Sequence, residues 1–206
     1  MDLWNDLSSF SAIPKRTLLN SRTLTYHPGA GDAMERDTNL GVVEQVRGGG
    51  FKRVLTATGL DQGNRLSYSI AMPDSRELVA TCAGRSKGVP STTSLTIGGS
   101  PAGSVARIDT EYSFLHASGE RIGAARIDGF TLHDAGGARI GTWRAYKKEH
   151  TAGEVVEDWL EWDRAGRSDV LQFGAMRANV AVDATIGPEL RTLLVALPIA
   201  ICFGYR

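Results

Sequence analysis

The sequence reads Tyr112-Ser-Phe-Leu-His-Ala-Ser-Gly-Glu-Arg-Ile-Gly-Ala-Ala-Arg126, and eighteen positions later it reads Phe130-Thr-Leu-His-Asp-Ala-Gly-Gly-Ala-Arg-Ile-Gly-Thr-Trp-Arg144. Each copy begins with alternating apolar residues, passes through a short stretch that contains glycine and resumes at Arg-Ile-Gly. Such a pattern is typical of a β-hairpin, so the repeat predicts two successive hairpins of one design. The apolar residues change parity inside each copy, which predicts a β-bulge or a strand that leaves the core partway.

Strand-like runs continue on both sides of the repeat and are separated by turn residues. They cover residues 23–27, 40–46, 51–57, 66–72, 77–82, 95–97, 140–146, 155–162, 169–173 and 179–182. About a dozen short strands without interleaved helical periodicity favour a closed antiparallel barrel. The chain of 206 residues is expected to form one domain over residues 20–206, preceded by an N-terminal extension over residues 1–19.

The end of the chain has a different pattern, which predicts a helix over about 188–204. Pro188 suits a first helical position, and Glu189 lies where the helix dipole favours an anion. The apolar run 193–203 extends around the whole helix and is about half of the ~20 residues that cross a bilayer, so we expect a buried core helix. Pro198 leaves two alternatives: a continuous or kinked helix, or a final strand from Ile199.

Composition limits the classes of function. Lys plus Arg and Asp plus Glu are equal at 23 each, so the chain lacks the overall positive charge typical of a nucleic-acid binder. The two cysteines, Cys82 and Cys202, are too few for a disulfide framework and are expected to be reduced and buried. The first residues carry acidic groups and no apolar segment of the secretory type. We therefore expect a cytoplasmic protein, one that can also associate peripherally with the membrane.

The turn exits Gly119-Glu-Arg-Ile122-Gly123 and Gly137-Ala-Arg-Ile140-Gly141, together with the apolar end of the chain at 193–203, resemble the tubby C-terminal-like superfamily. That superfamily includes the phospholipid scramblases and the LURP-one-related proteins, and the resemblance covers about residues 66–206. It implies a twelve-stranded barrel with the helix through its middle. The chain lacks the cysteine-rich segment, the acidic calcium loop and the Pro-rich N-terminal region of some members, so it is most similar to the small bacterial ones.

Basic residues recur near the ends of the predicted strands. Arg126 and Arg144 occupy equivalent repeat positions, Arg107 fits as a third, and Lys147 and Lys148 continue the last strand. If these residues line up across neighbouring strands, they form a positive stripe that can hold lipid phosphates. The competing interpretation pairs them with acidic neighbours as surface ion pairs, which contribute little. The acidic partners would be Asp109, Asp128 and Glu149.

Other motifs indicate no catalytic, metal or cofactor site. The 98–103 stretch lacks the spacing of a nucleophilic serine, and the 48–53 stretch has glycines and basic residues but precedes a strand instead of a helix. The four histidines occur singly, and the acidic run 154–163 is expected to form a solvated edge strand.

These observations and the resemblance lead to one expectation and two alternatives. The expectation is a non-enzymatic module that binds anionic phospholipid headgroups or the membrane surface through Arg107, Arg126, Arg144, Lys147 and Lys148, without a cofactor or nucleic acid. The first alternative is a protein-interaction barrel that uses exposed tryptophans among Trp4, Trp143, Trp159 and Trp162. The second is a hydrolase whose residues meet only in three dimensions.

Overall fold

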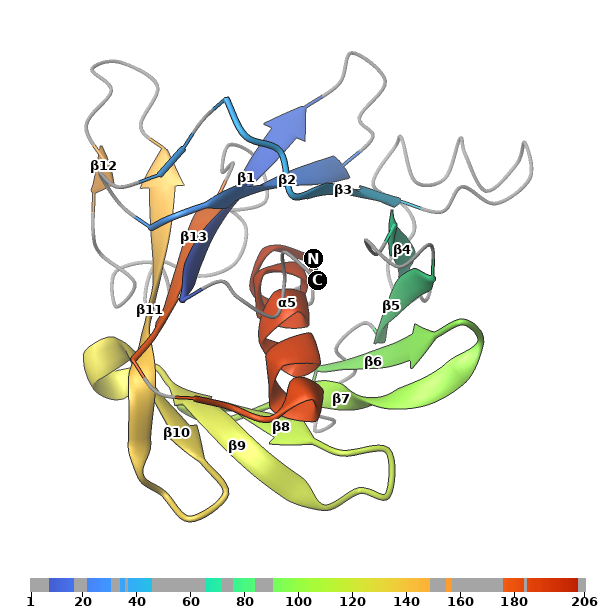
Figure 1. The fold of residues 1–206 in the computed structure, drawn as a ribbon, viewed down its shortest axis with the longest axis vertical. Helices are drawn as coiled ribbons and strands as arrows, with labels where there is room; N and C mark the ends of the chain where they lie inside the picture. Colours follow the sequence, from blue (N-terminus) through green and yellow to red (C-terminus); the bar gives the residue numbers. More distant parts are fainter. Residues whose placement is uncertain are drawn as a thin grey trace.

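The described part of the chain forms a closed antiparallel β-barrel with the helix α5 (Pro188–Phe203) inside it (Figure 1). The computed structural model describes residues 8–16, 22–30, 34–35, 37–45, 66–71, 76–83, 91–148, 155–156, 176–183 and 185–203. Within these ranges twelve strands form a ring in the order β10-β9-β8-β7-β6-β5-β4-β3-β2-β1-β13-β11, and pairing of β11 with β10 closes it. The predicted architecture is therefore confirmed.

The strands of the ring are short, as expected for a barrel of this size. They are β1 (Ser9–Arg16), β2 (Arg22–Pro28), β3 (Gly41–Gln45), β4 (Leu66–Ala71), β5 (Glu77–Ala83), β6 (Thr92–Ile97), β7 (Ser100–Ile108), β8 (Glu111–Leu115), β9 (Arg121–Arg126), β10 (Thr131–Asp134), β11 (Arg139–Lys148) and β13 (Met176–Val182). A short 3-10 turn, η2 (Asp128–Phe130), joins β9 to β10. The two-residue strand β12 (Val155–Val156) pairs with β11 outside the ring.

The sequence repeat forms two adjacent hairpins, β8–β9 and β10–β11. Each Arg-Ile-Gly begins the second strand of its hairpin, and the turn glycines Gly119 and Gly137 have φ of 89° and 83°. Register shifts after Phe114 and after Leu132 confirm the predicted bulge at equivalent points of both copies.

The glycine of Arg-Ile-Gly is needed because a side chain would not fit there, and not because its backbone conformation is unusual. A Cβ on Gly123 would lie 2.7 Å from the His133 carbonyl oxygen and 3.0 Å from Cδ1 of Leu190 in the helix. A Cβ on Gly141 would collide with the backbone of β13 at Ala181. The repeated glycine therefore marks close approaches of the barrel wall to its neighbours.

The helix α5 (Pro188–Phe203) fills the interior of the barrel. Every side chain from Leu193 to Ile201 is buried, and the helix contacts β5, β6, β7, β8 and β13. The helix continues through Pro198, so the alternative of a final strand from Ile199 is wrong. In the part of the chain that the structure describes, no helix is both long and apolar enough to cross a membrane.

The boundary predicted near residue 19 is wrong. Strand β1 pairs with β13 on one side and with β2 on the other, so residues 9–16 belong to the barrel wall. Its Phe10 and Ala12 are core residues. The pattern was missed because a polar serine, Ser11, is buried between them.

Several predicted strands are confirmed within a residue or two, and others cannot be compared. The runs predicted at 23–27, 40–46, 66–72 and 77–82 correspond to β2, β3, β4 and β5. The run at 155–162 coincides with described structure only at β12, while those at 51–57 and 169–173 lie outside the described residues.

Candidate functional site

The antiparallel pairing gives the barrel two distinct ends. The strands β1, β3, β5, β7, β9 and β11 finish at one end, where their ring partners β2, β4, β6, β8, β10 and β13 begin. The turns after β4, β6, β8 and β10 lie at the opposite end. We call the first of these the basic end, for the residues described next.

All five basic residues that the sequence singled out lie toward the basic end. Arg107 is the penultimate residue of β7, Arg126 is the last residue of β9, and Lys147 and Lys148 are the last two of β11. Arg144 lies in the second half of β11. The fold thus gathers residues that are up to 41 positions apart in the chain, from 107 to 148.

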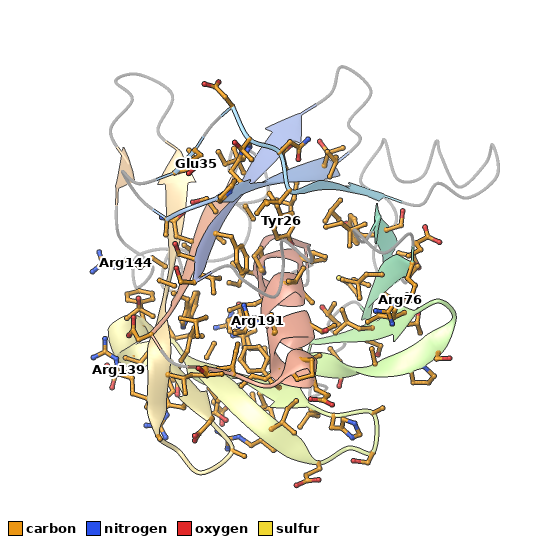
Figure 2. All side chains as sticks on the ribbon, in the orientation of Figure 1. Tyr26, Glu35, Arg76, Arg139, Arg144 and Arg191 are labelled. Atoms are coloured by element: carbon orange, nitrogen blue, oxygen red, sulfur yellow. The ribbon has the colours of Figure 1, made fainter. Side chains whose placement is uncertain are left out.

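Arg126 and Arg144 share the outer face of the barrel. Arg126 pairs with Thr131 of β10, which pairs with Thr142 of β11, and Arg144 is the next residue of β11 on that face. Both arginines are exposed, and Figure 2 shows Arg144 directed away from the helix. Two strand spacings and one pleat repeat place their Cα atoms roughly 12 Å apart.

Arg107 does not belong to this outer face, so the predicted three-residue stripe is wrong in that respect. The outer row of Arg126 continues through Glu111 to Ile108. Arg107 is paired with the buried Tyr112, and its guanidinium carbon lies 5.8 Å from the centre of the Tyr112 ring. Its Nε donates to the Asp109 carbonyl oxygen at 3.5 Å. Arg107 is half-buried and lies against the buried Tyr112 ring.

The ion pair on this outer face joins Arg121 to Glu111 at 3.1 Å. Glu111 also accepts a hydrogen bond from Ser113 at 2.9 Å. Among the described side chains, Arg126 forms no ion pair with Asp109 or Asp128, and Glu149 lies outside the described residues. For Arg126 the ion-pair interpretation is therefore not supported within the described part of the chain.

Sequence reasoning missed four further basic residues at this end. The strands β2, β1, β13 and β11 are consecutive neighbours, and their 32 residues include eight Lys or Arg and no Asp or Glu. Seven of the eight lie toward the basic end, and we call this group the basic arc: Lys15, Arg16, Arg22, Arg144, Lys147, Lys148 and Arg177. The eighth, Arg139, begins β11 at the opposite end. The sequence shows that each of these strands lacks acidic residues, but it does not show that the four strands are neighbours in the sheet.

The remaining candidates have structural roles. Ser100 begins β7 after a turn in which Gly98 and Gly99 have φ of 55° and 84°, which confirms a hairpin turn. His27 contacts the Thr38 carbonyl oxygen through Nδ1, and His133 contacts the Gly137 carbonyl oxygen and Thr131. In the described ranges no three His, Cys, Asp or Glu side chains gather as metal ligands would.

Trp143 is a core residue and not part of a contact surface. Its side chain is 1% exposed, and its indole nitrogen donates to the Arg126 carbonyl oxygen at 2.9 Å. The rings of Tyr112 and Phe130 pack edge-on against it. Trp4, Trp159 and Trp162, as well as the 48–53 stretch and His150, lie outside the described residues.

Comparison with known proteins identifies no relative. No protein-family model matches the chain, and neither the curated proteins nor the solved structures give a significant match. The family resemblance drawn from the hairpin repeat and the helix stays a prediction.

Proposed function

We propose that the protein is a non-enzymatic binding module for anionic phospholipid headgroups at a membrane surface. The observation that carries the proposal is the collection of Arg107, Arg126, Arg144, Lys147 and Lys148 at one end of the barrel. The resemblance to the tubby-like and scramblase-like proteins points to the same class of ligand.

The interior of the barrel is filled by packed side chains, which favours a binding site on the outside. Buried side chains of α5, such as Leu193, Leu194 and Leu197, pack in one core with strand residues. A ligand that contacts the described part of the chain therefore meets the outer surface or the rims of the barrel. Arginine suits this role because its planar guanidinium forms paired hydrogen bonds with phosphate oxygens.

Vesicle sedimentation at low ionic strength tests the proposal. We expect the protein to sediment with phosphatidylcholine vesicles that contain phosphatidylserine and to stay in solution with phosphatidylcholine alone. Each basic residue near an anionic bilayer contributes about 1 kcal/mol, which is about fivefold in partition. The variant Arg126→Gln with Arg144→Gln should bind about 25-fold less.

A charge-reversed variant gives the decisive result. Lys147→Glu with Lys148→Glu should abolish sedimentation at low salt, because two attractions become two repulsions. Equal sedimentation with charged and neutral vesicles, or no effect of either double variant, would contradict the proposal. A melting temperature close to that of the wild type must accompany each result.

A further inference from the structure

We infer that the Arg126 guanidinium is kept available to an anionic headgroup because two neighbours hold the Glu111 carboxylate away from it. The two neighbours are Ser113 and Arg121, which thereby act as positioning residues on the outer face of the barrel. The inference rests on the proposed function. It deepens that function by naming an internal competitor of the ligand, the Glu111 carboxylate, and the groups that restrain it.

The strand register makes Glu111 the nearest acidic partner for Arg126. Glu111 begins β8 directly opposite Arg126, which ends β9, and both belong to one outer row of the barrel. Residues directly opposite each other in an antiparallel pair have Cα atoms about 4.5–5.5 Å apart, and opposite charges there stabilise the sheet. The register alone therefore predicts an ion pair between Glu111 and Arg126.

The Glu111 carboxylate is bound elsewhere. Its Oε1 accepts a hydrogen bond from the Ser113 hydroxyl at 2.9 Å, and Nη2 of Arg121 lies 3.1 Å from Oε1 and 3.3 Å from Oε2. Ser113 is two residues further along β8, with about 7 Å between the Cα atoms. Arg121 is opposite Leu115, further still toward the opposite end of the barrel. Both partners thus draw the carboxylate away from the end where Arg126 lies.

Burial shows why this arrangement is preferred. Ser113 is only 3% exposed, so its bond to Glu111 is shielded from water, whereas the side chains of Arg121 and Glu111 are 48% and 24% exposed. An exposed ion pair alone contributes little. The shielded hydroxyl and the ion pair act together on one carboxylate, and each oxygen of that carboxylate has a partner.

Arg126 is left with a fixed backbone and an exposed side chain. Its carbonyl oxygen accepts a hydrogen bond from Nε1 of the buried Trp143 at 2.9 Å. In the described part of the chain no carboxylate forms an ion pair with its guanidinium. Because the backbone is already fixed, what decides the binding of an anion is whether Glu111 occupies the guanidinium.

The sequence repeat supplies an internal comparison. In the second copy, eighteen positions later, Arg139 takes the place of Arg121, and Gly129 takes the place of Glu111. The second copy therefore has this arginine without the acid. Arg139 is exposed, and within the described ranges it forms no ion pair (Figure 2). Removal of Arg139 costs the same charge as removal of Arg121 but releases no carboxylate.

The test removes both contacts of the Glu111 carboxylate. In the variant Arg121→Gln with Ser113→Ala, the carboxylate turns to Arg126 and neutralises it. Partition into phosphatidylcholine vesicles that contain phosphatidylserine should fall about fivefold, which is the loss expected for Arg126→Gln alone. Ser113→Ala by itself changes no charge and should give a smaller loss in the same direction.

The matched control changes the same residue types elsewhere. Arg139→Gln with Ser94→Ala removes the repeat-equivalent arginine and an exposed serine of β6. Its partition should stay within about twofold of the wild type. If the variant Arg121→Gln with Ser113→Ala fails to fold, Arg121→Gln alone is compared with Arg139→Gln and should bind less.

Rescue distinguishes competition by Glu111 from a simple loss of charge. Glu111→Gln, added to Arg121→Gln with Ser113→Ala, should restore partition to within about twofold of the wild type. In an Arg126→Gln background, Arg121→Gln with Ser113→Ala should cause no further loss. A simple loss of charge would give the same decrease with and without Arg126.

Urea unfolding gives a readout that needs no membrane. The effects of Glu111→Gln and Arg126→Gln on stability should add in the wild type, since the two side chains do not interact there. In the Arg121→Gln, Ser113→Ala background the same two effects should no longer add, because the new ion pair joins them.

Each outcome separates the inference from the proposed function. If the wild type binds anionic vesicles and Arg121→Gln with Ser113→Ala binds equally well, the inference is overturned while the proposed function stands. Failure of Glu111→Gln to restore partition, or additivity in both backgrounds, has the same consequence. If the wild type ignores anionic vesicles, the proposed function is overturned, and the role of Ser113 and Arg121 in binding falls with it.

Discussion

Tyr26 on β2 donates its phenolic hydrogen to the carbonyl oxygen of Val195 in α5, across 2.7 Å. The Tyr26 side chain is completely buried, and Figure 2 shows it beside the helix. Three residues further along, Pro198 lacks the N–H that an α-helix needs at that point. The barrel wall thus supplies a donor to the helix backbone near the place where the helix loses one of its own.

Replacement of Tyr26 by Phe should destabilise the protein by about 1–3 kcal/mol. The change retains the ring and removes the buried hydroxyl that donates to the Val195 carbonyl oxygen. For a chain of this size the melting temperature should fall by about 2–4 °C per kcal/mol. Urea unfolding followed by fluorescence measures the change, and an unchanged midpoint would show that the hydrogen bond contributes nothing net.

Gly123→Ala should cost about 1–3 kcal/mol, because the added Cβ has no room between the His133 carbonyl oxygen and Leu190. Gly136→Ala is the matched control. It is an exposed glycine of the second repeat copy, and a Cβ there would lie 3.4 Å from Asp134, an ordinary contact. Thermal unfolding of both variants gives the comparison. Equal melting temperatures would show that the helix or β10 moves aside without cost.

The hairpins could be predicted from sequence because their contacts are local. Strands β8 to β11 follow one another in the chain and in the sheet, so the alternation and the turn glycines that precede Arg121 and Arg139 were sufficient. The buried helix could be predicted equally well, because exposure of its long apolar run to water would be strongly unfavourable. Strand β1 could not be predicted from local patterns, because it pairs with β13 from the far end of the chain.

The candidate site was predicted in part, for the same reason. Arg126 and Arg144 do share a face, since the repeat fixes their relation. Arg107 falls on the other face because the two-residue turn after Ile108 sets Ile108, and not Arg107, opposite Glu111. A shift of one position reverses the face of every side chain in a strand, and sequence spacing alone does not determine it.

Ser11 and Asn179 form a buried polar contact, 2.8 Å long, between β1 and β13. Asn179→Ala and Ser11→Ala should each cost about 1–3 kcal/mol, since each leaves a buried polar group without this partner. The double variant should cost less than the sum, because both single changes remove the same bond. A control at the exposed Ser94, Ser94→Ala, should change stability by less than about 0.5 kcal/mol. Strict additivity in urea unfolding would show that the two residues act independently.

Cys82 should make the protein less stable in alkaline solution. Burial raises the pKa of the Cys82 thiol from 9.0 to about 11, against the smaller lowering effect of Thr93, whose hydroxyl lies 3.4 Å from the sulfur. The unfolded chain loses this proton near pH 9 while the folded chain keeps it until about pH 11. The stabilisation is therefore complete below pH 9 and is lost as the pH rises to about 11, by about 2–3 kcal/mol in total.

The measurement compares Cys82→Ala with the parent protein across this range of pH. The parent should lose about 2–3 kcal/mol more than the variant between pH 9 and 11, when stability is measured by urea unfolding at each pH. In a Cys202→Ser background the native thiol should resist iodoacetamide at pH 8, since thiolate is the reactive form. Rapid alkylation of the folded protein, or parallel pH profiles for parent and variant, would show that the Cys82 thiol ionises as freely in the folded chain as in the unfolded one.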